Sequence, residues 1–250
     1  MLMVVLLAAA TGAVDVSWLT KVSKTMIDKL QIKRQTCVAA NVPKQENQAR
    51  LNELLSDDFV KEALKWTKKE TIYGVDDIVV ALARSVHAEV AVMTEVKDAM
   101  KKAKTDGDFL FIYSFFSPCE KCTTKGGLNN IVDSLEKHAK DWGEAVFVFS
   151  NVYEKPNKGD PFSREVLVKA LKSLGDSMGG LKNVYRCYQQ QQTFGCHVCS
   201  SGNGPAEVCL VQKYVPAQGG AGVGRSKSLD HGDAGKKKSG SGRSKSAGRA

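Results

Sequence analysis

Apolar residues follow two spacings that alternate along the 250-residue chain. Where they recur every three or four residues, they predict amphipathic helices. The predicted helices cover residues 16–34, 46–66, 87–104, 119–139 and 164–178. Short continuous apolar runs, rich in β-branched and aromatic residues, predict buried strands. The predicted strands cover residues 36–42, 78–82, 108–115, 145–149 and 184–188, with a last strand expected at 208–214. Strands alternating with helices indicate an α/β sheet covered by helices on both faces.

The chain between strands 145–149 and 184–188 predicts their relative direction. Residues 150–183 include a predicted helix, and a tight hairpin would not use that much chain. A helical crossover makes the two flanking strands parallel. We therefore expect these two strands to run in the same direction.

Both ends of the chain differ from its middle. Residues 1–13 are uncharged and apolar and end in small residues, which is typical of a signal peptide for secretion; a buried N-terminal helix or strand is the alternative. We expect one domain over residues 14–216, with a Cys-rich extension at 187–216, and a disordered Gly- and Ser-rich tail at 217–250. No later stretch is long and apolar enough to span a bilayer, so we expect no membrane insertion.

The net charge of +9 is concentrated in the tail. Residues 219–250 contain eight basic and two acidic residues, which leaves a net charge of +3 for the rest of the chain. The tail could bind nucleic acid or another polyanion without sequence preference. It could also be only a solubilising end. The basic composition therefore says little about the surface of the folded domain.

Two short motifs carry the candidate chemistry. His87-x-Glu89 and Pro118-Cys119-x-x-Cys122 each begin a predicted helix shortly after a predicted strand. Two helix N-termini side by side can bring one imidazole and two thiolates to a single point, and the helix dipole favours the thiolate form. Such a ligand set suits Zn²⁺ and leaves its fourth tetrahedral position for water. We therefore predict one catalytic zinc ion held by His87, Cys119 and Cys122.

Glu89 lies two residues beyond the predicted histidine ligand. That offset turns its carboxylate away from the metal but leaves it near the water position, which suits proton transfer. The order H-x-E followed by P-C-x-x-C is the signature of zinc-dependent nucleobase deaminases. Taken alone, a histidine before a helix is usually structural, and Cys-x-x-Cys could be a disulfide or a redox motif. Their joint occurrence at two strand-to-helix corners favours the zinc site.

At these residues the sequence resembles the cytidine deaminase superfamily, and more narrowly the activation-induced deaminase and APOBEC group. Residues 117–122 match that group's S-P-C-x-x-C core, and Phe116 stands where the group usually has Trp. The resemblance covers residues 35–190 in element order, with residue-level matches confined to the two zinc segments. It implies a cytidine deaminase-like three-layer α/β/α sandwich with a five-stranded mixed sheet. Strands 4 and 5 of that sheet are parallel, an arrangement that the resemblance associates with deaminases of polynucleotides.

The resemblance also implies a function and substrate contacts. It implies a zinc-dependent deaminase that converts cytosine to uracil in single-stranded DNA or RNA, in the secreted branch of the group, with a role in immune defence. Phe116 and Tyr153 would stack on the base, and Asn41 would hydrogen-bond the sugar or base edge. For these three residues the alternatives are a core aromatic, a loop aromatic and a turn residue.

Two further functions stay open from the sequence. One is deamination of free nucleosides, against which the long connection after residue 149 and the basic tail argue mildly. The other is a zinc-stabilised nucleic-acid-binding protein without turnover. Glu89 argues against the second, because a purely structural site needs no proton shuttle.

Five cysteines remain beside the predicted zinc ligands: Cys37, Cys187, Cys196, Cys199 and Cys209. In a secreted chain they predict disulfides, at most two, with one thiol left over and a connectivity that the sequence leaves open. The alternative is a second, structural zinc site built from the last four of these cysteines, with His197 as a further ligand.

Overall fold

The computed structural model describes residues 14–69, 72–83, 87–96, 98–156, 159–202 and 204–213. The chain divides into two units, residues 1–214 and 215–250, and all described residues belong to the first. The predicted signal peptide at 1–13 and the predicted tail at 217–250 lie outside the described residues. Among the described helices, none has the length and apolar character that a bilayer span needs.

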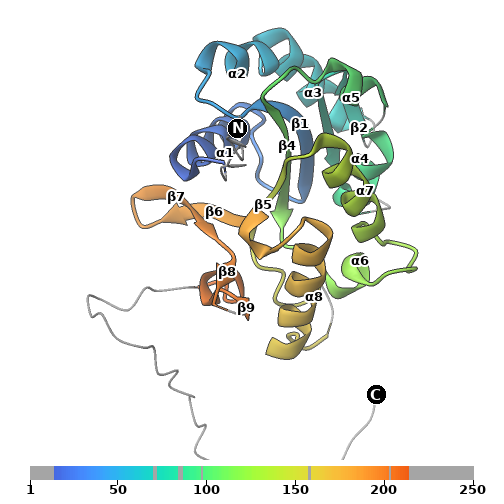
Figure 1. Ribbon diagram of the computed structural model, residues 1–250, viewed down its shortest axis with the longest axis vertical. Helices are drawn as coiled ribbons and strands as arrows, with labels where there is room; N and C mark the ends of the chain where they lie inside the picture. Colours follow the sequence, from blue (N-terminus) through green and yellow to red (C-terminus); the bar gives the residue numbers. More distant parts are fainter. Residues whose placement is uncertain are drawn as a thin grey trace, which may run out of the picture. The chain divides into compact units, whose positions relative to one another are not determined.

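A mixed seven-stranded sheet forms the centre of the fold, in the order β2-β3-β1-β4-β5-β6-β7 (Figure 1). Its strands are β1 Thr36–Pro43, β2 Ile72–Val75, β3 Ile78–Leu82, β4 Asp108–Phe116, β5 Ala145–Asn151, β6 Val184–Gln190 and β7 Thr193–Val198. The strands β4, β5 and β6 are parallel, and the other neighbouring pairs are antiparallel. The predicted parallel pairing of 145–149 with 184–188 is therefore confirmed.

The sheet has two strands more than the five expected. Both additional strands lie at its edges, where one side of the strand has no partner in the sheet. β2 is only four residues long and partly exposed, and β7 is partly exposed, with Thr, Gly and His interrupting its apolar residues. Neither contains the continuous apolar run by which the inner strands were predicted, because an edge strand is not buried on both faces.

Helices cover both faces of the sheet, as predicted (Figure 1). The helices are α1 Val16–Lys29, α2 Gln48–Leu54, α3 Asp57–Lys69, α4 Ala88–Glu95, α5 Asp98–Ala103, α6 Glu120–Thr123, α7 Val132–Trp142 and α8 Arg164–Ser177. α1, α2 and α3 pack on the face that carries Phe109, Phe111 and Tyr113 of β4. α4, α7 and α8 pack on the opposite face, which carries Leu110 and Ile112. Because both faces are covered, the successive residues 109–113 of β4 are all apolar or aromatic.

Three helices predicted as continuous are interrupted. Residues 46–66 form α2 and α3, residues 87–104 form α4 and α5, and residues 119–139 form the single turn α6 followed by α7. Gly126, in the connection between α6 and α7, has a φ of 74°, which favours glycine. Apolar spacing continues across these breaks because the separate helices pack on the same layer. The spacing alone therefore overestimated helix length.

The Cys-rich extension is held by two disulfides, Cys187–Cys196 and Cys199–Cys209. The first joins the paired strands β6 and β7, and the second joins the segment after β7 to the 3₁₀ helix η2, Glu207–Cys209. Between them lies the small hairpin of β8, Ser200–Ser201, and β9, Gly204–Pro205. The preference for disulfides is confirmed, and the alternative zinc site is wrong because its sulfurs are paired with one another. The strand expected at 208–214 is also wrong, because its first residues belong to η2.

Candidate metal centre and active site

The two predicted motifs meet at the end of the sheet where β4 finishes. His87 is the residue that precedes α4, and Cys119 precedes α6, three residues after the end of β4. Both have extended backbone, with ψ angles of 139° and 164°. A residue in this position directs its side chain toward the positive end of the helix that follows, which favours a thiolate. The local structure therefore matches the two strand-to-helix corners expected from the sequence.

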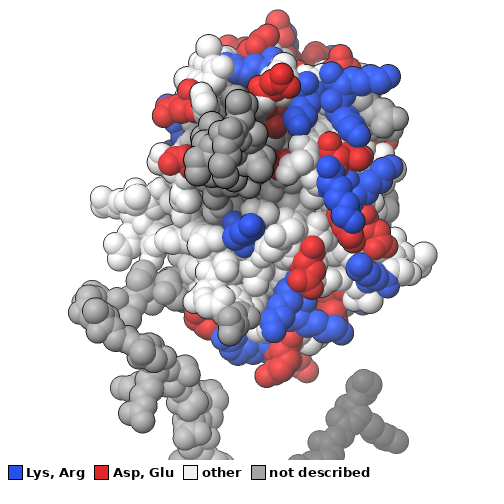
Figure 2. Space-filling view, viewed as in Figure 1, with Lys and Arg blue, Asp and Glu red and all other residues white. Residues whose placement is uncertain are grey.

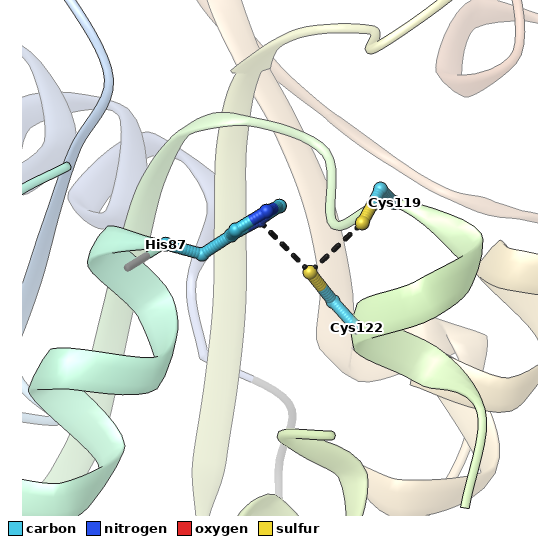
Figure 3. A group of neighbouring side chains, drawn as sticks. All are labelled: His87, Cys119 and Cys122. Carbon is cyan, nitrogen blue, oxygen red and sulfur yellow. Dashed lines mark hydrogen bonds between the residues drawn. The ribbon is translucent and has the colours of Figure 1, made fainter. Parts of the chain in front are cut away.

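His87, Cys119 and Cys122 form one compact group (Figure 3). Their potential ligand atoms all lie within 4.8 Å of one another. The Sγ atoms of Cys119 and Cys122 are 2.9 Å apart, and Cys122 Sγ is 3.1 Å from His87 Nδ1. Among the described residues this is the only group of three or more His, Cys, Asp or Glu side chains close enough to share a metal ion.

The group's electrostatics suit a cation. The hydrogen bond with Cys122 lowers the pKa of Cys119 to about 4, and the same hydrogen bond raises the pKa of Cys122. The pKa of His87 is raised, first by its hydrogen bond with Cys119 and further by the nearby charges of Cys119 and Glu89. Metal binding requires both sulfurs as thiolates, and the lowered pKa of Cys119 favours this form for one of them.

Glu89 lies beside this group in the first turn of α4 and is 2% exposed. Ser114 of β4 donates a hydrogen bond of 2.6 Å to its Oε1. Its other oxygen, Oε2, is buried and has no hydrogen-bond partner among the described residues. Burial raises the pKa of the Glu89 carboxyl, and the Ser114 hydrogen bond partly opposes that rise. The carboxylate is thus held at one oxygen and left available for a proton at the other.

The residues present fit a zinc ion with a water molecule as its fourth ligand. One imidazole and two thiolates are a ligand set that zinc prefers, and three protein ligands leave one coordination position free. A buried carboxylate oxygen without a partner is costly unless a further group occupies the site. A water molecule on the metal would supply a hydrogen bond to Glu89 Oε2. This unpartnered oxygen is an observation independent of the sequence motif.

Ser114 was not among the predicted site residues. It is fully buried and comes from the middle of an apolar strand, Phe109 to Phe116. A hydroxyl at a position where every neighbour is apolar is a signal that could have drawn attention to it. Its partner could not be read from the sequence, because the contact depends on how α4 packs on the sheet.

Phe116 and Tyr153 lie together at the same end of the sheet. Phe116 is the last residue of β4, and Tyr153 follows β5 by two residues. Their ring centroids are 5.8 Å apart at an interplanar angle of 67°, and the Phe162 ring lies 5.7 Å from that of Tyr153. Both Phe116 and Tyr153 are partly exposed. The pKa of Tyr153 is raised, first by burial and then by the negative charge at Cys119 and Cys122, which places the phenol near the metal group.

Asn41 does not belong to this site. It is fully buried, and its side-chain amide donates to Asp77 Oδ1 and Met100 O and accepts from Trp142 Nε1. β1 is antiparallel to β4 and pairs Asn41 with Leu110, whereas the site lies at the Ser114 end. The expected substrate contact is therefore corrected: Asn41 joins the elements at the far end of the sheet.

Comparison with known proteins agrees with the geometry. A family model described as Secreted Novel AID/APOBEC-like Deaminase 1 matches residues 17–213, a range that contains both motifs and the Cys-rich extension. No curated protein matches the chain. Since the match spans far more than half of the 250 residues, the chain is a member of the Secreted Novel AID/APOBEC-like Deaminase 1 family.

Proposed function

We propose that this protein is a zinc-dependent hydrolytic deaminase that converts cytosine to uracil with release of ammonia. The observation that carries the proposal is the unpartnered Glu89 Oε2 beside the group of His87, Cys119 and Cys122. A structural metal site would not need a buried carboxylate with one free oxygen. Family membership supports the deaminase class.

The protein's own residues divide the chemistry among them. Zinc held by His87, Cys119 and Cys122 would supply Lewis-acid activation of water near neutral pH. Glu89 accepts a proton from the attacking water through Oε2, while Ser114 holds Oε1. Glu89 passes this proton to the ring nitrogen, then takes the second proton of the same water from the oxygen now bound to the ring carbon and passes it to the departing amine. The balance is one water consumed and one ammonia released for each cytosine converted.

We propose a cytosine in single-stranded nucleic acid as the substrate. Phe116, Tyr153 and Phe162 form a group of aromatic rings beside the metal group, suited to stacking on an unpaired base. The parallel pairing of β5 and β6 is the arrangement that the resemblance associates with polynucleotide deaminases. A free nucleoside would use the same metal group and Glu89, so the assay below includes it as a competing outcome.

We propose that the protein acts outside the cell in immune defence. The family description contains the word secreted, and two disulfides are typical of an oxidising compartment. A signal peptide at residues 1–13 would direct secretion.

Figure 2 shows basic and acidic side chains side by side over the helices of one face and few charges over β6 and β7. We therefore propose that the basic tail, residues 217–250, contributes the electrostatic binding of nucleic acid or another polyanion.

The test is a paired deamination assay on purified, zinc-loaded protein. A cytosine-containing single strand and free cytidine are each incubated with the wild type, with Glu89→Gln and with the control Glu165→Gln. Glu165 carries the same carboxyl group on an exposed turn of α8. We expect uracil in the single strand from the wild type and the control, and none from Glu89→Gln although its zinc stays bound. If free cytidine is converted to uridine faster than the single strand is deaminated, the substrate is a free nucleoside. Full activity of Glu89→Gln would overturn the mechanism.

A further inference from the structure

The end of the Cys-rich extension contacts the segment that follows β5. Gln212 accepts a hydrogen bond from the backbone N–H of Val152 through Oε1, at 2.5 Å, and donates through Nε2 to Asn151 Oδ1, at 2.8 Å. Its own backbone N–H donates to Glu154 Oε1. One residue far along the chain thus contacts Asn151, Val152 and Glu154, which flank Tyr153 on both sides.

Asn151 links this contact to the cysteine ligands. Its side chain donates to Phe115 O, and its backbone carbonyl accepts from the backbone N–H of Ser117, at 2.7 Å. Ser117 in turn accepts a hydrogen bond from the backbone N–H of Tyr153 at 2.9 Å. Ser117 lies two residues before Cys119. The chain after β4, which leads to the metal group, and the chain after β5, which carries Tyr153, are therefore joined through the residues that Gln212 contacts.

A buried arginine fixes Gln212 from the other side. Arg186 of β6 is 1% exposed, and its guanidinium donates to the carbonyls of Val208, Val211 and Gln212 at 2.7–2.9 Å. Its Nε donates to Ser150 O in β5, and its guanidinium lies 4.2 Å from the centre of the Tyr188 ring. The disulfide Cys199–Cys209 closes the same segment covalently. Residues 208–212 are thus held in place by hydrogen bonds from the buried Arg186 guanidinium and by the Cys199–Cys209 disulfide.

We propose that Gln212 is a positioning residue of the active site, which sets the place of Tyr153 relative to the metal group. Arg186 and the Cys199–Cys209 disulfide hold residues 208–212 in place, and this segment in turn holds Gln212 against the chain around Tyr153. This inference rests on the proposed function, because Tyr153 is assigned there to the substrate base. Glu89 and its partner Ser114 lie on α4 and β4 and are not contacted by Gln212. Loss of the Gln212 amide therefore weakens substrate binding and leaves the proton-transfer step intact.

The test uses the full chain with Gln212→Ala, because Arg186 variants lose the five hydrogen bonds of a buried guanidinium and could fail to fold. Gln189→Ala is the matched control, since Gln189 is exposed and, within the described part of the chain, its amide bonds to Gln191 O in its own turn. We expect Gln212→Ala to raise KM for the cytosine-containing strand roughly fivefold to tenfold with kcat changed by less than about twofold, because the substitution removes three side-chain hydrogen bonds. Zinc content should equal that of the wild type.

Amide hydrogen exchange supplies a readout that needs no turnover. In Gln212→Ala the peptide covering residues 145–156 should exchange about tenfold faster, while β1 keeps its wild-type rate. Gln212→Glu retains the acceptor for Val152 but loses the donor to Asn151, so it should protect Val152 and still raise KM. Wild-type KM in Gln212→Ala would overturn the positioning role while leaving the proposed function intact. If the wild type deaminates no cytosine substrate, the proposed function fails, and unchanged exchange at residues 145–156 would then overturn the Gln212 contact as well.

Discussion

Replacing Ser114 with Ala removes the hydrogen bond that its hydroxyl donates to the Glu89 carboxylate. Ser114 Oγ lies 2.6 Å from Glu89 Oε1, and both residues are buried. A hydrogen bond to a charged group contributes about 1.5–3 kcal/mol. At 1.36 kcal/mol for each pKa unit, this corresponds to a rise of about one to two units in the pKa of Glu89. The direction follows from the present balance, in which burial raises that pKa and the Ser114 hydroxyl opposes it.

The consequence is a change in pH dependence. Glu89 must be ionised to accept a proton, so activity falls as the pH drops through its pKa. In Ser114→Ala the acidic limb of kcat/KM should therefore begin at a higher pH, by about one to two units, with a smaller loss on the alkaline side. The control is Ser150→Ala on the neighbouring strand β5, whose hydroxyl bonds Tyr113 on the opposite face of the sheet. Superimposable pH profiles for Ser114→Ala and the wild type would refute the role of the hydroxyl.

Three further changes test other parts of the structure. Cys119→Ser should lower bound zinc well below one ion per chain by elemental analysis, whereas Cys37→Ala should keep it, because Cys37 is a free buried cysteine outside the metal group. Replacing Cys199 and Cys209 together by Ala should lower the free energy of unfolding by about 2.7 kcal/mol, from a closed loop of sequence separation 10, and Tm by roughly 5–11 °C in calorimetry; an unchanged Tm would contradict this. Asn41→Ala should cost roughly 3 kcal/mol in denaturant unfolding, because it leaves buried partners unsatisfied, while kcat/KM of the folded protein stays at the wild-type value.

The metal group could be predicted because its geometry depends on local structure. His87, Cys119 and Cys122 each sit at or near the start of a helix that follows a strand, and such corners collect at one edge of a sheet. Only the order of residues and the strand-to-helix transitions were needed. The inner strands were predictable for a similar reason, since burial on both faces leaves a continuous apolar run.

Asn41 shows where this reasoning fails. It lies near the carboxyl end of its strand, as the ligand-bearing corner lies after the carboxyl end of β4. Because β1 is antiparallel to β4, however, the carboxyl end of β1 lies beside the amino end of β4, away from the metal group. Strand direction depends on long-range pairing, which the apolar pattern does not encode.

Ser114 and Gln212 were missed for a related reason. Each acts through a contact with a residue distant in the sequence: Glu89 in one case, Asn151 and Val152 in the other. The position of Gln212 further depends on which cysteines are paired, and connectivity cannot be deduced from spacing. Residues that hold the site in place could therefore be identified only from the structure. Residues that perform its chemistry could be predicted from their types and their order in the sequence.

The most direct measurement is the release of ammonia and uracil from a cytosine-containing single strand by zinc-loaded protein, compared with Glu89→Gln carrying the same amount of zinc. Equal quantities of both products from the wild type and neither from the variant are predicted, because Oε2 of Glu89 is the free proton acceptor beside the metal group. Equal product formation by the two proteins, or none by the wild type on any cytosine substrate, would contradict the assignment of this site as a deaminase centre.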